Sequence, residues 1–388
     1  MYGFTEEQQM IKDLAAQFAD ERVRPVRAEL DEKEEFPHDL LQQLAQTGLF
    51  GIYIEERFGG SGGGVLDLCI ATEEISRVCG GVGVSYAANA LGAYPIILHG
   101  AEEMKQRYLP KVASGQMYAA FCLTEPGVGS DAGGIKTLAT KDGDGFLISG
   151  TKQWITNGGV AGVYSVITIT DKSRGPRGAT AFVVDRNSPG LSIGKKEKKM
   201  GIRCSSTTEV HFDNVRVGKE NILGGVGRGF RVAMDTLDKS RPGIGAQAVG
   251  IAQGAMDEAL AFAKERIQFG QPVTHFQAIQ HMLADMATQI EASRLLVYQA
   301  ARLADSPDAK SATVAKLAAM CKYYASDTAM KATTDALQIC GGSGYMREYP
   351  LEKMMRDAKI TQIYEGTNQI QRNVIANAII RESVSRKK

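Results

Sequence analysis

The carboxylate of Glu365 is the group in this sequence best placed to do chemistry, because Tyr364 and Gly366 flank it. A carboxylate held among apolar neighbours loses hydration, so its pKa rises and it becomes a usable base near neutral pH. Gly366 lets another group approach the backbone closely. An isolated Tyr-Glu-Gly-Thr is also typical of a surface turn before a helix. The segment therefore predicts a general base only if other parts of the chain agree.

Three changes of sequence texture indicate the elements that position this residue. Residues 1–117 have helical spacing and begin with a capping-box pattern at 5–8. Residues 118–227 contain short β-branched and aromatic runs separated by turn residues. Helical periodicity returns, in longer segments, over 228–388. We expect an α+β protein with an N-terminal helical domain, a middle antiparallel β-barrel or β-sandwich domain and a C-terminal four-helix bundle.

The helical periodicity is specific enough to place individual segments. The predicted helices lie near 39–48, 66–78, 82–99, 102–114, 229–239, 243–266, 276–304, 311–339 and 368–382. They leave the Tyr364–Gly366 turn directly before the last helix.

Charge and composition exclude several classes of partner. Lys and Arg total 45 and Asp and Glu total 44, so no strong positive field favours nucleic acid or an anionic membrane. The N-terminus carries no signal or transit pattern, and no apolar run is expected to span or insert into a membrane. We expect a cytoplasmic protein in a bacterium, or a mitochondrial matrix protein if the chain is processed. The six cysteines form no Cys-x-x-Cys pair and the five histidines are scattered, so we expect reduced thiols and no metal site.

Two glycine patterns match a loose dinucleotide-binding motif. The first, at 127–132, follows a predicted strand but is not followed by the helix whose N-terminus would bind a pyrophosphate. The second, at 243–248, is preceded by a helix instead of a strand. Neither pattern predicts a Rossmann domain.

Five segments, taken in order over nearly the whole chain, resemble the acyl-CoA dehydrogenase family. They read FCLTEPGVGSD at 121–131, KQWITNG at 152–158, RIQFGQPV with FQAIQ at 266–280, QICGGSGY at 338–345 and YEGT at 364–367. In the family, the first two segments border the flavin ring of FAD. The third and fourth reach the FAD of a neighbouring subunit. The resemblance implies FAD as cofactor and a homotetramer built as a dimer of dimers.

The resemblance also assigns the cofactor-binding residues. They are Phe121, Leu123, Thr124, Gly129, Ser130, Trp154, Ile155, Thr156, Arg266, Gln268, Phe269, Gln277, Gln338, Ile339, Gly341, Gly342, Thr367 and Gln369. Each has a plainer reading beside this one. The threonine hydroxyls could satisfy local backbone, and Trp154 could be a core residue. Arg266 could pair with Glu265 on a helix surface, and Gly341-Gly342 could simply end a helix.

The reaction that the resemblance implies is α,β-dehydrogenation of an acyl-CoA thioester. Glu365 is the catalytic residue that removes the α-proton, and flavin N5 takes the hydride from the β-carbon. The backbone N–H of Glu365 and a ribityl hydroxyl of FAD would stabilise charge on the thioester oxygen. The substrate-binding residues implied are Ser130, Asp238, Arg241, Tyr364 and Gly366. Without the resemblance, Asp238 and Arg241 read equally well as an i,i+3 helix pair.

Some features narrow the substrate. Isovaleryl-type and long-chain-type members carry the base elsewhere, so Glu365 argues against them. Val82 aligns with an arginine that decarboxylating glutaryl-CoA enzymes use, which argues against a dicarboxyl substrate. The segment 81–96 offers small and apolar residues plus Tyr86, compatible with a short straight, branched or alicyclic acyl group. We predict a short-chain or butyryl-type enzyme, with a cyclohexane- or cyclohexene-carboxyl-CoA dehydrogenase as the alternative.

Two other functions remain open on the same scaffold. In an oxidase or monooxygenase, oxygen would take the electrons, but Glu at 365 and the lack of an extra C-terminal domain count against this. A flavin-bearing binding protein would not need the intact base. The leading prediction is a dehydrogenase that passes electrons to an electron-transfer flavoprotein.

Overall fold

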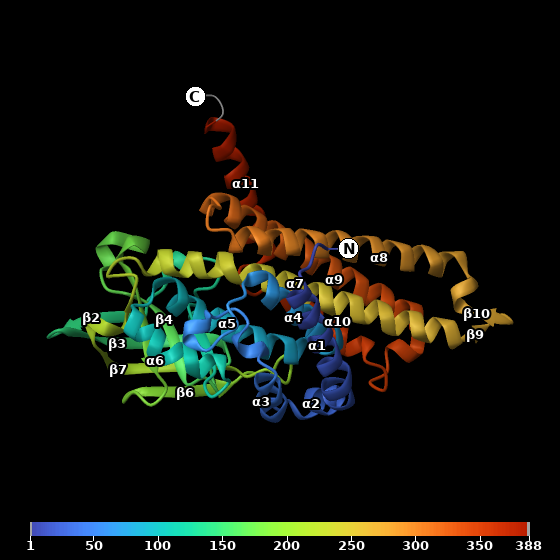
Figure 1. Ribbon diagram of the computed structural model, residues 1–388, viewed down its shortest axis with the longest axis horizontal. Helices are drawn as coiled ribbons and strands as arrows, with labels where there is room; N and C mark the ends of the chain where they lie inside the picture. The colour runs from blue at the N-terminus through green and yellow to red at the C-terminus, as the bar shows by residue number, and fades with distance from the viewer. Residues whose placement is uncertain (1, 386–388) are drawn as a thin grey trace.

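The computed structural model describes residues 2–385, and its elements follow the predicted order of helices, sheet and helices (Figure 1). The predicted α+β fold class is confirmed. Thr5 caps the first helix, because its side chain accepts a hydrogen bond from the backbone N–H of Gln8. The α-helices of this part are α1 (Glu6–Phe18), α2 (Arg27–Lys33), α3 (His38–Gln46), α4 (Val65–Val78), α5 (Gly80–His99) and α6 (Glu102–Ala113).

The middle of the chain forms one sheet, of eight strands within the described residues. The strands are β1 (Ala119–Cys122), β2 (Leu138–Asp142), β3 (Gly145–Thr156), β4 (Val163–Ile169), β5 (Ala179–Asp185), β6 (Leu191–Lys196), β7 (Thr207–Val217) and β8 (Ile222–Leu223). Their order is β6-β7-β3-β2-β4-β5-β8, with β1 beside β4. Ile148, Tyr164 and Phe182 belong to the apolar core on one face of the sheet.

The expectation of a purely antiparallel sheet needs a correction. Strand β4 pairs in parallel with β1, and also with β2 at one register position, Leu138 opposite Ile169. A parallel neighbour needs a long return connection, and the β2–β3 hairpin supplies it between β1 and β4. The pattern of short strands and turns predicted the strands but not which of them return in the same direction.

The C-terminal part is helical, as predicted. Its elements are α7 (Gly229–Glu265), β9 (Ile267–Gln268), β10 (Gln271–Pro272), α8 (Gln277–Asp305), α9 (Ser311–Gly344), α10 (Leu351–Thr361) and α11 (Asn368–Ser385). The two helices predicted at 229–239 and 243–266 are one helix that continues through Pro242. Proline removes one backbone donor, but a long and well-packed helix tolerates that loss. Helix α10 was not predicted and adds a fifth helix to the expected four.

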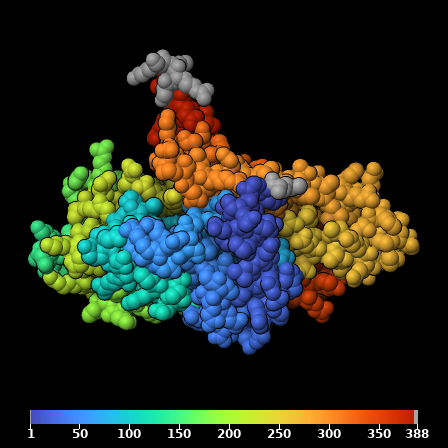
Figure 2. Space-filling model, in the orientation of Figure 1, coloured from blue at the N-terminus to red at the C-terminus, as the bar shows by residue number. Residues whose placement is uncertain are grey.

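The long helices connect two distant ends of the molecule. Helices α7, α8 and α9 pack along one another, and the β9–β10 hairpin lies at the end opposite the sheet (Figure 1). Helix α11 projects from the body, as the space-filling view also shows (Figure 2). The segment around Arg266 is therefore carried far from the sheet of its own chain.

Helix α5 is long and apolar enough to cross a membrane by length and composition, contrary to the sequence expectation. However, 78% of its apolar window is buried inside the protein. It packs against α4, α7 and β1, so it has the character of a core helix. One of its faces contributes to the wall of a cavity beside the sheet.

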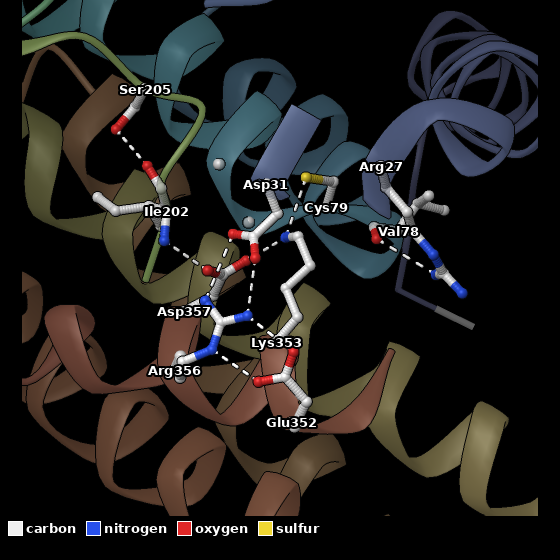
Figure 3. A network of polar contacts seen from close by, with 12 residues as sticks. Arg27, Asp31, Val78, Cys79, Ile202, Ser205, Glu352, Lys353, Arg356 and Asp357 are labelled. Atoms are coloured by element: carbon white, nitrogen blue, oxygen red, sulfur yellow. Dashed lines mark hydrogen bonds and ion pairs between the residues drawn. The ribbon is translucent and has the colours of Figure 1, made fainter. Parts of the chain in front are cut away.

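A buried polar network joins the start of α5, the loop before β7 and helix α10 (Figure 3). Lys353 donates hydrogen bonds to Asp357 at 2.6 Å and to the sulfur of Cys79 at 3.3 Å. The other oxygen of Asp357 accepts from the backbone N–H of Ile202 at 2.5 Å. Because both oxygens of Asp357 are used, this network fixes three parts of the chain at one point.

Candidate active site

A cavity of about 490 Å³ lies between α5, the loops of the sheet, α7 and the turn before α11. Residues from three of the five family-like segments line it, namely the first, the second and the fifth. The predicted site residues that line it are Phe121, Leu123, Thr124, Gly129, Ser130, Trp154, Ile155, Thr156, Arg241, Tyr364, Glu365 and Gly366. Positions up to 245 residues apart in sequence thus meet around one space.

Glu365 lies in a tight turn between α10 and α11. Its φ of 52° and that of Gly366, 91°, are both left-handed, so two successive residues turn the chain sharply. Glycine adopts this conformation freely, whereas glutamate does so at a cost. The turn is held from outside, because Arg241 and Gln371 donate to the Glu365 carbonyl at 3.3 Å and 3.1 Å.

Glu365 lines the cavity, and its carboxylate has one direct side-chain partner among residues 2–385. The hydroxyl of Ser240, on α7, donates to Oε2 at 2.5 Å. Burial raises the pKa of Glu365 to about 7, although the Ser240 hydrogen bond and the charges of Arg241 and Lys322 act to lower it. A carboxyl with this pKa is ionised in a large fraction of molecules near neutrality and still accepts a proton readily. The raised pKa expected from burial is therefore present, whereas the role of Glu365 as a base stays a prediction.

Other polar groups around the turn come from α7. Asp238 and Arg241 form an ion pair at 2.9 Å, so the i,i+3 helix pair exists, while Arg241 also lines the cavity. Burial raises the pKa of Asp238 to about 6, against the lowering effect of Arg241. The hydroxyl of Tyr364 hydrogen-bonds to the Gln247 amide oxygen, and burial keeps the pKa of this phenol well above its usual value. Asp238 itself is not a lining residue.

The wall formed by the sheet fits a flat, partly polar ring system. Trp154, the one tryptophan of the sequence, has 58% of its surface exposed and a left-handed φ of 57°. The core alternative for Trp154 is therefore wrong. Thr124, Ser130 and Thr156 line the same cavity. An exposed aromatic ring beside residues that carry hydroxyl groups suits a flavin ring.

The remaining predicted cofactor residues do not line this cavity. Arg266, Gln268, Phe269 and Gln277 lie at the β9–β10 end of the molecule (Figure 1). Gln338, Ile339, Gly341 and Gly342 lie near the C-terminal end of α9, where Gly341 has a left-handed φ of 58°. This end adjoins the end of α7, because Phe262 contacts Tyr349 edge to face. Thr367 and Gln369 follow the Tyr364–Gly366 turn but are not lining residues.

Two residues used to argue about the substrate are not on the cavity wall. Val82 is fully buried, and Tyr86 donates its hydroxyl to the carbonyl of Leu49 at 2.9 Å. The helical period turns both toward the protein interior. The lining residues of α5 are Val84, Ala87, Ala88, Ala90, Leu91 and Tyr94. The apolar character expected of this wall therefore holds, with Tyr94 in place of Tyr86.

Four residues that contact the turn were not predicted as site residues. Ser240, Gln247, Lys322 and Gln371 contact the 364–366 segment directly. Only Ser240 could have been found, since it precedes the predicted Arg241 on the same helix. Nothing in the sequence around Lys322 distinguishes it from the other lysines of α9, Lys316 and Lys331.

Three family models match consecutive parts of the chain. They are the acyl-CoA dehydrogenase N-terminal domain over residues 5–116, the middle domain over 120–215 and the C-terminal domain over 227–380. The chain belongs to the acyl-CoA dehydrogenase family, which confirms the resemblance seen in the five segments. Proteins of this family use FAD, and the fit of the sheet wall agrees with that cofactor.

Individual relatives are similar over nearly their whole length. The short-chain-specific acyl-CoA dehydrogenase of Clostridium acetobutylicum is 46% identical over 98% of this chain and 100% of its own. The solved butyryl-CoA dehydrogenase of Megasphaera elsdenii is 44% identical, with a TM-score of 0.94 over 98% of this chain and 100% of its own. A chain from a study of the electron-transferring flavoprotein of Acidaminococcus fermentans is 47% identical, with a TM-score of 0.95 and the same coverage. This protein is an acyl-CoA dehydrogenase, an oxidoreductase acting on CH–CH donors.

Proposed function

We propose that this protein oxidises a short acyl-CoA to the trans-2-enoyl-CoA, with Glu365 as the base that removes the α-proton. The observation that carries the proposal is the position of Glu365. Glu365 lines the cavity, its carboxylate accepts a hydrogen bond from Ser240 at 2.5 Å, and burial raises its pKa to about 7. When bound, FAD supplies the acceptor for the hydride that leaves the β-carbon.

The residues of this chain prepare the proton transfer. Arg241 and Gln371 hold the Glu365 carbonyl, so the carboxylate and the backbone N–H of Glu365 keep a fixed relation. That N–H is the donor we assign to the thioester oxygen, where negative charge develops as the α-proton leaves. The apolar wall of α5 and the ring of Trp154 limit water around the reacting carbons.

The cavity favours a short, uncharged acyl group. The lining residues of α5 carry no charge, so no cation is available there for a distal carboxylate. The Clostridium relative is described as short-chain specific and the Megasphaera relative as a butyryl-CoA dehydrogenase. We assign a butyryl-like or short branched substrate, and a cyclic acyl group remains the alternative.

Two observations support the proposed electron acceptor and assembly. The Acidaminococcus chain comes from a study of an electron-transferring flavoprotein, which supports such a flavoprotein as redox partner. We assign the reaction to fatty-acid β-oxidation. Phe269 is 93% exposed at the β9–β10 end. The predicted cofactor residues near it do not line the cavity of their own chain. We assign this end, with Arg266 and the Gln338–Gly342 segment, to the FAD site of a partner subunit in a homotetramer. The relatives named above are bacterial, which favours the cytoplasm of a bacterium over the mitochondrial matrix.

An anaerobic titration tests the proposal. The FAD-loaded protein is mixed with butyryl-, isobutyryl-, octanoyl- and cyclohexanoyl-CoA while the visible flavin band is recorded. We expect bleaching by one or two short members and none in Glu365→Gln. A flavin band that no thioester bleaches would overturn the assignment. Rapid oxygen consumption with a bleaching substrate would instead favour the oxidase alternative.

A further inference from the structure

A lysine that does not line the cavity contacts the Tyr364–Gly366 turn. Lys322 of α9 is fully buried. Its ammonium donates to the carbonyl of Gly366 at 2.8 Å and to the amide oxygen of Asn368 at 2.9 Å. Both acceptors are neutral. Among residues 2–385, no carboxylate oxygen lies within 4.0 Å of the Lys322 nitrogen.

The charged and titratable groups around Lys322 come from three elements. They are Glu365 in the turn, Arg241 on α7, and Cys321 and Asp327 on α9. The Asp327 carboxylate is already occupied, because Asn368, Gln362 and Arg372 donate to it. The charge of Asp238 is likewise taken up by Arg241 at 2.9 Å. Glu365 is thus the carboxylate whose charge acts most strongly on Lys322.

Burial lowers the pKa of Lys322 to about 7, and the Glu365 charge opposes that shift. The same burial raises the pKa of Glu365 to about 7, and the charge of Lys322 opposes it. Each group therefore supports the charged form of the other. Because the lysine contacts the carbonyl next to Glu365 and not its carboxylate, the carboxylate stays free to face a substrate.

From this geometry we infer that Lys322 is a positioning residue for the reaction. Its ammonium holds the Gly366 carbonyl, and its charge favours the ionised carboxylate of Glu365 before proton transfer. The inference rests on the proposed role of Glu365 as the base. It goes further because it assigns a role in keeping Glu365 ionised to a residue of α9, a helix that does not line the cavity.

The test compares two variants of the FAD-loaded enzyme over a range of pH. Lys322→Met removes the charge and the donor, whereas Lys322→Gln keeps an amide donor and removes only the charge. Without the charge, the pKa of Glu365 rises further, so the acid limb of kcat/KM moves to higher pH. We expect a shift of about one pH unit, or roughly a tenfold loss below that limb, with FAD content unchanged. Lys331→Met, on the exposed face of the same helix, is the matched control and should keep the wild-type profile.

A second readout does not depend on turnover. The infrared carbonyl band of protonated Glu365, identified by its loss in Glu365→Gln, is titrated in substrate-free protein. A higher midpoint in both Lys322 variants supports the inference, even if no acyl-CoA bleaches the wild-type flavin. The absence of bleaching would overturn only the proposed function. A wild-type midpoint in folded Lys322→Gln overturns the inference, as does a wild-type pH profile. If Lys322→Met does not fold, the glutamine variant decides both readouts.

Discussion

Lys322 and Lys353 are both buried lysines in the C-terminal helices, yet their surroundings differ in one respect. Lys353 donates to the carboxylate of Asp357 at 2.6 Å and to the sulfur of Cys79. Burial opposes its charge, but Asp357 and the sulfurs of Cys79 and Cys204 outweigh burial and raise its pKa. Lys322 donates only to neutral oxygens, and burial lowers its pKa to about 7.

The difference shows how one residue type serves two purposes. A buried lysine with its own carboxylate keeps its charge at every physiological pH and joins parts of the fold. A buried lysine without one becomes sensitive to the charge of any ionisable group nearby. At Lys322 that group is Glu365, the proposed base.

The largest effect should come from removing that base. Glu365→Gln keeps the shape of the turn but cannot take a proton, so turnover should fall by about 10³-fold or more while FAD and acyl-CoA still bind. Rapid mixing with the bleaching substrate measures the fall. The pKa of Lys322 should also decrease, since its supporting charge is gone, whereas that of Lys353 should not move. Retained turnover would show that another group is the base.

The second largest effect should come from removing the carboxylate partner of Lys353. Asp357→Asn leaves a buried ammonium without its carboxylate, and we expect a loss of about 3–5 kcal/mol in the free energy of unfolding. The pKa of Lys353 would then lie below its unfolded value. The variant should therefore recover stability as pH rises from about 7 toward 10, because the unfolded state binds more protons there. Urea unfolding at several pH values measures this, and a loss independent of pH would contradict the reasoning.

A double variant of Glu365 and Lys322 tests the comparison through the free energy of unfolding. Glu365 has a raised pKa, so it destabilises the fold above about pH 7, less so as pH falls toward 4.5, and not below that. Lys322 has a lowered pKa, so it destabilises the fold below about pH 7 and progressively less above it. Glu365→Gln with Lys322→Gln should exceed wild type by about 1–2 kcal/mol near pH 7, with a smaller excess on either side. Urea unfolding near pH 5, 7 and 9 would reveal whether such a maximum exists.

The smallest expected effect concerns Ser240. Its hydroxyl supports the ionised carboxylate of Glu365 at 2.5 Å, so Ser240→Ala should raise the pKa of Glu365. We expect the acid limb of kcat/KM to move up by roughly half a unit to one unit, with kcat above the limb close to wild type. Thr236→Ala, one turn earlier on α7, serves as the control, because its hydroxyl donates to a helix carbonyl. An unchanged limb would mean that water replaces the hydroxyl fully.

Sequence pattern alone predicted the order of helices and strands, and also the turn that holds Glu365, because both depend on neighbouring residues. Ser240 and Lys322 meet the turn across 125 and 44 positions, and no local pattern records such contacts. The same limit explains why the parallel pairing of β1 with β4 was missed. Tyr86 shows a different failure, since the right helix was predicted but the wrong face was assigned to the cavity. Local chemistry was thus readable, whereas packing across the chain was not.

The left-handed conformation of Glu365 has a consequence for how this sequence can evolve. At a φ of 52°, glycine would be under less strain by about 1 kcal/mol, and it would bury no carboxyl group. On the proposed role of Glu365 as the base, a chain selected only for heat resistance should drift to glycine at this position and lose turnover. Directed evolution toward thermostability should therefore fix position 365 beforehand.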